Sequence, residues 1–113
     1  TDEEKAYKAE VMEKCLKDAA EVPMGIMRCA CQALDILKQF AEKGSKMMIS
    51  DAGCGAVCCR AALEAASLNV FINTKSMKDR QYAEELNAQA DAMLAKYSSL
   101  AQEIYLQVTN QCR

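Results

Sequence analysis

Asp51, Asn69 and Asn73 are the polar side chains of this sequence best suited to act on a substrate. Asp51 follows Ser50, and the two asparagines stand one helical turn apart farther along the chain. A carboxylate can carry a proton, and paired amides can hydrogen-bond a substrate. Each also has a structural explanation, because Asp51 would stabilise the first turn of a helix capped by Ser50, and the asparagines would satisfy an irregular helix end. The residues alone leave both explanations open.

The residues that most often hold metals or act as general bases are absent or unsuitably spaced. The chain has no histidine, so acid–base chemistry would have to use carboxylates, lysine, cysteine or tyrosine. The cysteines are odd in number and form no Cys-x-x-Cys pair, which argues against a disulfide framework. We expect no metal site and seven unpaired thiols in a reducing, cytoplasmic environment; they are Cys15, Cys29, Cys31, Cys54, Cys58, Cys59 and Cys112.

A long first helix is predicted over residues 2–43. Its apolar side chains recur every three or four residues, at positions 9, 12, 16, 19, 23, 27, 30, 34, 37 and 41. Pro23 lies on this stripe and is expected to kink or divide the helix, because proline removes a backbone donor. Few polar residues follow Pro23, so that part of the helix is expected to be buried on most sides. Gly44 is expected to end it.

The central helix is predicted to begin at Ser50 and is rich in alanine and glycine. Gly53 and Gly55 each lower helix propensity by about 1 kcal/mol relative to alanine, and tight packing against a neighbouring helix would offset that loss. Alanine at either position should regain propensity, whereas leucine should overpack the contact. Arg60 and Glu64 have the spacing of an ion pair on this helix.

A last helix is predicted from about Met77 to Cys112, with an apolar stripe from Tyr82 to Val108. The three segments together predict an all-α antiparallel bundle of long helices, one of them kinked near Pro23. A chain of 113 residues fits one domain, 1–113.

Charge and hydropathy restrict the classes of partner. The formal net charge of −2 provides no basic field for nucleic acid. The most apolar segment, 52–72, carries Arg60 and Glu64 in its middle, where a bilayer would penalise them. We therefore expect neither nucleic acid nor a membrane as a partner.

Two stretches of the sequence resemble a known enzyme family: Ser50-Asp51-Ala52-Gly53 and Asn69-Val70-Phe71-Ile72-Asn73, joined by the small-residue helix. The similarity runs from about Glu4 to Lys96 and includes the Glu21-Val22-Pro23 step. It resembles the helical cyclodeaminase and methenyltetrahydrofolate cyclohydrolase family, which includes the second domain of formiminotransferase-cyclodeaminase. The family's domain extends upstream of this chain, so the chain resembles its C-terminal half, and the upstream part carries the family's best catalytic candidate.

The resemblance implies folate-dependent one-carbon chemistry without a metal. The methenyl bridge of tetrahydrofolate would be closed with loss of ammonia or opened by water. Asp51 would be a catalytic carboxylate, Asn69 and Asn73 would contact the substrate, and Lys46 and Lys75 would face the anionic glutamate tail of folate. Solvation of helix ends is the simpler role for these lysines. The alternative function is a non-catalytic helical dimerisation module.

Spacing along the helix constrains any shared site. Asp51 and Asn69 are eighteen residues apart, which places them on the same face but about 27 Å from each other at 1.5 Å per residue. Either the helix breaks, or a second subunit lying antiparallel completes the site, or only one end is functional. The apolar faces of the first two helices also exceed what a small bundle covers. We therefore expect a homodimer with an isologous interface.

Overall fold

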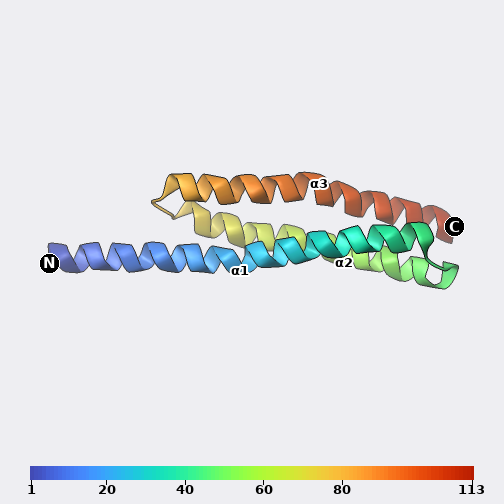
Figure 1. The fold of residues 1–113 in the computed structure, drawn as a ribbon, viewed down its shortest axis with the longest axis horizontal. Coiled ribbons are helices and arrows are strands. Elements are labelled where there is room, and N and C mark those ends of the chain that lie inside the picture. The colour runs from blue at the N-terminus through green and yellow to red at the C-terminus, as the bar shows by residue number, and fades with distance from the viewer.

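The computed structural model describes residues 1–113, except for the side chains of Lys46 and Met47. It consists of three long helices, α1 (Asp2–Lys43), α2 (Lys46–Lys75) and α3 (Arg80–Cys112). Each helix runs antiparallel to the one before it, and the ribbon forms a rod (Figure 1) of 68 × 19 × 17 Å. The predicted all-α antiparallel bundle is confirmed.

Helix α1 begins with a reciprocal cap and continues through its proline. The Glu4 backbone N–H donates to the Thr1 hydroxyl at 3.2 Å, and the Thr1 amino group reaches the Glu4 carboxylate at 3.2 Å. Pro23 lies inside the helix and is buried, so the predicted division there is wrong. Figure 1 shows only a gentle bend along the middle of α1. Gly44 ends the helix as predicted, with its N–H donating to the Phe40 carbonyl at 2.7 Å.

Helix α2 begins earlier than the sequence pattern indicates. Its N-cap is Ser45, in an extended conformation and without a side-chain cap bond. The predicted start at Ser50 is therefore wrong, and Asp51 lies in the second turn, beyond the region where the helix dipole acts strongly. The physical reason is burial: with the extra turn in place, Ile49 is only 8 % exposed and packs in the core beside Ala52.

The core has two clusters along the rod. One joins the middle of α1 to the second half of α2 and the first half of α3, and its largest fully buried members are Met24, Met27, Leu63 and Val70. The other lies at the opposite end of α2 and centres on Leu34, Ile49, Ala56, Ile104 and Val108. The side chain of Tyr97 packs against both, so the two clusters form one continuous core.

The part of α1 that follows Pro23 is less buried than the sequence predicts. Ile26, Ile36 and Phe40 are 47 %, 55 % and 44 % exposed. On α2, Met48 and Val57 are each 49 % exposed. Three helices in a narrow rod leave these apolar faces uncovered, which is the surplus of apolar surface that the sequence indicated.

By length and hydropathy, one helical segment among the described residues could cross a membrane: Met48–Lys75, within α2. In the fold, α2 packs against both α1 and α3 and supplies Leu63, Ala66 and Val70 to the core. Central helices of helical domains meet the same criterion, so the segment's composition does not distinguish the two roles.

The two glycines of α2 have different neighbours. A Cβ placed on the buried Gly53 would lie 2.8 Å from Val108 Cγ1 and 3.2 Å from Val108 Cβ, so the close approach of α2 to α3 requires glycine there. A Cβ on Gly55 would lie 3.2 Å from the two methyl groups of Leu37. Valine has no flexible stem with which to withdraw, whereas leucine can turn its terminal methyls aside. At Gly53 the helix propensity that alanine would regain is therefore opposed by a close contact that the sequence did not indicate.

We predict that Gly53→Ala lowers the melting temperature whereas Gly55→Ala leaves it unchanged or raises it. Overpacking at Gly53 costs about 1–3 kcal/mol, which exceeds the gain in helix propensity of about 1 kcal/mol. Thermal melts followed by circular dichroism measure the difference, with the two leucine variants as controls expected to melt lower still. Equal melting temperatures for the two alanine variants would contradict the close contact at Gly53.

Candidate functional site

Asp51 and Asn69 lie near opposite ends of one uninterrupted helix. Helix α2 runs from Lys46 to Lys75 without a break, so their separation along its axis is about 27 Å. The predicted alternative in which the helix breaks is therefore excluded. Asp51 is exposed, and no described side chain hydrogen-bonds its carboxylate. Within this chain, Asp51 cannot contact a small substrate held at Asn69.

Asn69 and Asn73 form a ladder along the outside of α2. The Asn69 Nδ2 donates to the Ala65 carbonyl at 3.3 Å, and the Asn73 Nδ2 donates to the Asn69 carbonyl at 2.8 Å. Beside them, Leu68 and Ile72 are 70 % and 68 % exposed. The amides thus have the structural hydrogen bonds that the sequence left open as one role. Asn69 is exposed and Asn73 is half-buried, and an exposed aliphatic border lies beside them.

The structure does not place the two predicted lysines, Lys46 and Lys75, beside the amide ladder on one face of α2. Lys75 is exposed at the end of α2, but it is rotated by about 200° from Asn73 at 100° per residue, so the two do not share a face. The side chain of Lys46 lies outside the described residues. Lys75 and Lys46 are at opposite ends of α2, so a substrate in one chain reaches at most one of them.

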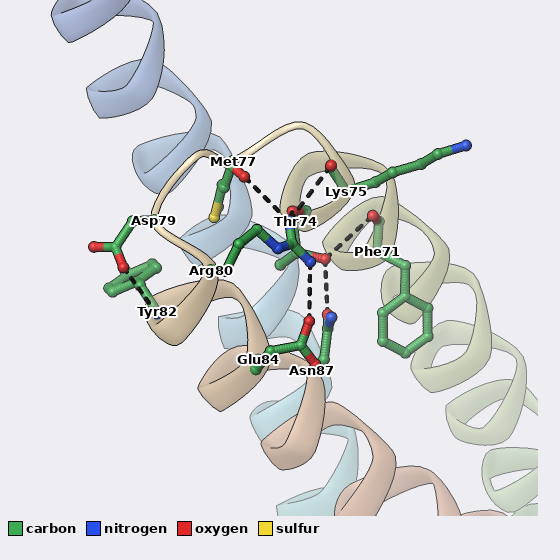
Figure 2. Close-up of polar contacts among 9 residues, drawn as sticks. All are labelled: Phe71, Thr74, Lys75, Met77, Asp79, Arg80, Tyr82, Glu84 and Asn87. Carbon is green, nitrogen blue, oxygen red and sulfur yellow. Dashed lines mark hydrogen bonds and ion pairs between the residues drawn. The ribbon is translucent and has the colours of Figure 1, made fainter.

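Arg80 clamps the end of α2. Its Nη1 donates to the carbonyls of Thr74 at 2.8 Å, Met77 at 3.1 Å and Lys75 at 3.5 Å, and its Nη2 contacts the Glu84 carboxylate at 2.9 Å (Figure 2). The last carbonyls of a helix lack partners within the helix, and this guanidinium contacts two of them, at Thr74 and Lys75, together with the Met77 carbonyl of the turn. Arg80 is therefore a structural residue rather than a free cation for an anionic ligand.

Thr74 and Asn87 tie the same helix end to α3. Thr74 is only 1 % exposed, and its hydroxyl lies 2.7 Å from Asn87 Oδ1 and 3.2 Å from the Phe71 carbonyl (Figure 2). Sequence reasoning missed this pair. Thr74 continues the buried line of Leu63, Ala66 and Val70 at helical spacing, and a buried hydroxyl on such a line requires a partner.

Helix α1 also holds the turn between α2 and α3. The Glu13 carboxylate accepts from the backbone N–H groups of Lys78 at 2.8 Å and Asp79 at 3.0 Å. Lys17 pairs with Asp79 at 2.9 Å, and Asp79 in turn caps α3 by accepting from the Tyr82 N–H at 3.1 Å. The two backbone donors hold the pKa of Glu13 below its ordinary value, and the Lys17 hydrogen bond lowers the pKa of Asp79.

The cysteines occupy positions without a common centre. All seven are free thiols, and burial raises the pKa of Cys31 and Cys59, which keeps both protonated at neutral pH. Leaving aside the side chains of Lys46 and Met47, no three Cys, Asp or Glu side chains gather where they could hold a metal ion.

A groove of about 310 Å³ opens between α2 and α3 at the Asp51 end of α2. Its walls are mainly apolar and come from Ser50, Gly53, Cys54, Val57, Tyr105, Val108, Thr109, Cys112 and Arg113. Asp51 is not part of these walls, so the groove does not unite the predicted carboxylate with a ligand cavity.

Comparison with known proteins identifies the family. The family model of formiminotransferase-cyclodeaminase matches residues 1–92. The chain belongs to this family. It is also 39 % identical over 105 residues to a methenyltetrahydrofolate cyclohydrolase from Methylorubrum extorquens, a match that covers 93 % of this chain and 50 % of the relative. The chain thus spans about half the length of this curated relative, and the resemblance seen in the sequence is confirmed.

The contact between Glu13 and the α2–α3 turn predicts that the thermal stability of the protein depends on pH. Because folding lowers the pKa of Glu13, its stabilising effect is complete well above the unfolded value of about 4.3 and is lost as the pH falls through the lower folded value. Glu13→Gln should therefore melt below the wild type at pH 7, and the gap should close in acid. Thermal melts between pH 7 and pH 3 measure it.

Glu10→Gln is the matched control, because Glu10 is an exposed glutamate on the same helix. It should melt like the wild type across the pH series. A gap for Glu13→Gln that persists unchanged at the acid end would show that its carboxylate does not stabilise the turn by being ionised.

Proposed function

We propose that this chain is part of a folate-dependent one-carbon enzyme, a formimino-tetrahydrofolate cyclodeaminase or a methenyl-tetrahydrofolate cyclohydrolase. The observation that carries the proposal is the family match across most of the chain, together with the similarity to a methenyltetrahydrofolate cyclohydrolase. The amide ladder of the exposed Asn69 and the half-buried Asn73 supports it, because it offers hydrogen-bonding groups beside an aliphatic surface. We place the reaction in the cytoplasm, where the exposed thiols would stay reduced.

Both reactions require a proton carrier and an oriented ring more than a metal. Closing the bridge expels ammonia, which must leave protonated, and opening it requires removal of a proton from water. Asp51 is the carboxylate we assign to proton transfer on this chain. Lys46 and Lys75, at the two ends of α2, are assigned to the anionic glutamate tail of folate, and a tetrahydrofolate derivative is the substrate.

We further propose that the site is shared between two copies of the chain. The rigid α2 keeps Asp51 far from Asn69, but antiparallel pairing of two α2 helices would set the Asp51 end of one beside the Asn69 end of the other. The same pairing would bring Lys46 of one copy near Lys75 of the other copy. The exposed apolar side chains of α1 and α2 provide surface for an isologous contact.

Sedimentation equilibrium over a dilution series tests this assembly. We expect a dimer at micromolar concentration, because the uncovered apolar side chains would otherwise face water. Charged replacements at Ile36 and Phe40, which are 55 % and 44 % exposed, should weaken it more than the same change at Tyr7, which is 69 % exposed at the far end of α1. A compact monomer throughout the series would refute the dimer and the shared site.

A second candidate function is a non-catalytic helical dimerisation module. The unbroken α2 keeps Asp51 about 27 Å from Asn69, and this distance favours the module over a complete catalytic site within one copy of the chain. It would keep the bundle and its pairing surface without binding folate.

Two parallel assays separate these functions: ammonia release from formimino-tetrahydrofolate, and hydrolysis of methenyl-tetrahydrofolate. They should be run on this chain and on a chain extended to the relative's length. We expect one activity in the longer chain, reduced at least tenfold by Asp51→Asn if that carboxylate transfers a proton, since general acid–base catalysis contributes about 10²–10⁴-fold. The absence of both activities from both chains would favour the dimerisation module.

A further inference from the structure

The partners of the Asn69 and Asn73 side chains determine which way their amides face. Each Nδ2 donates to a backbone carbonyl four residues earlier. A carbonyl oxygen only accepts, so the nitrogen of each amide must face the helix and the oxygen must point away from that bond. No described residue donates to either Oδ1. Each amide therefore keeps an acceptor oxygen and one remaining N–H for a ligand.

The surface around the ladder is suited to a flat ring. Leu68 and Ile72 form a second line one residue to the side of the amides, and both are more than two-thirds exposed. The two residues of each line are four positions apart, which is a rise of about 6 Å at 1.5 Å per residue. A bicyclic ring can thus lie against the aliphatic line while its edge faces both amides.

The helix end that carries the ladder is held more firmly than helix ends usually are. Asn73 is two residues from the end of α2, where unsupported turns fray. Directly after it, Thr74 is joined to Asn87 through its hydroxyl and to Arg80 through its carbonyl (Figure 2). Because both contacts come from α3, the two amides are preorganised before a ligand arrives.

We propose that Asn69 and Asn73 bind the pterin end of the folate through its lactam edge, which carries a 2-amino donor, an N3–H donor and a C4 carbonyl acceptor. The amide oxygens accept from the ring donors, and a remaining amide N–H donates to the ring carbonyl. Leu68 and Ile72 support the face of the ring. This inference rests on the proposed function and specifies which part of the substrate α2 recognises.

Binding of two ligands to paired variants tests the proposal. Tetrahydrofolate carries the 2-amino donor, and 2-desamino-2-methyl-tetrahydrofolate lacks it. Dissociation constants are measured for the intact wild-type protein and for Asn69→Ala and Asn73→Ala. The wild type should bind tetrahydrofolate about tenfold more tightly than the analogue, which corresponds to one hydrogen bond. At least one alanine variant should bind both ligands equally.

Asn110→Ala is the matched control, because Asn110 is an exposed asparagine on α3, and it should keep the tenfold preference. Because alanine has a high helix propensity, the three substitutions should leave α2 and α3 helical. A thermal melt of each variant checks that it is folded. If the wild type binds tetrahydrofolate and both ladder variants keep the full preference, the lactam assignment is overturned while the proposed function stands. If the wild type does not bind tetrahydrofolate, both are overturned.

Discussion

The unbroken backbone hydrogen bonding of α2 is the constraint on which the other features depend. One thirty-residue helix carries the candidate carboxylate near its beginning and the amide ladder near its end. A helix of this length does not fold back on itself, so it fixes a distance that no small substrate spans. Any joint action of the two ends has to come from outside the chain, and the uncovered apolar side chains of α1 and α2 show where such contacts have surface available.

Small residues make this helix suitable as the centre of the bundle. The absent side chain at Gly53 lets Val108 approach the α2 backbone, Ala52 and Ala56 are buried in the same core cluster as Val108, and Ala66 is buried farther along the helix. Close approach of this kind gains dispersion contacts that larger side chains would prevent. A rod less than 20 Å wide nevertheless has little interior in which side chains can be buried. The polar contacts at the α2–α3 turn therefore fix the position of the end of α2 relative to its neighbours.

The helices could be predicted from sequence because their apolar stripes have one period and Gly44 interrupts them clearly. Local signals were less reliable where packing competed with them. Ser50 looked like a cap, but burial of Ile49 extended the helix backward by a turn. Pro23 looked like a kink or a break, yet it is buried inside α1 and the helix continues through it.

The site was less predictable because its geometry depends on side-chain orientation and on contacts between different helices. Asn69 and Asn73 could be chosen by their spacing, and their orientation followed only from their backbone partners. The roles of Glu13 and Arg80 could not be derived from their own neighbours, since one acts on a turn 65 residues away and the other on the preceding helix.

The Glu13 contact also changes how the molecule can open. The amides of Lys78 and Asp79 lie in a surface turn, where exchange with solvent is normally fast, but both donate to a carboxylate on α1. Their release requires the Glu13 carboxylate to leave both donors, so a fluctuation of the loop alone is opposed by a contact from α1. The protection of these two amides therefore reports on the contact between the turn and the first helix.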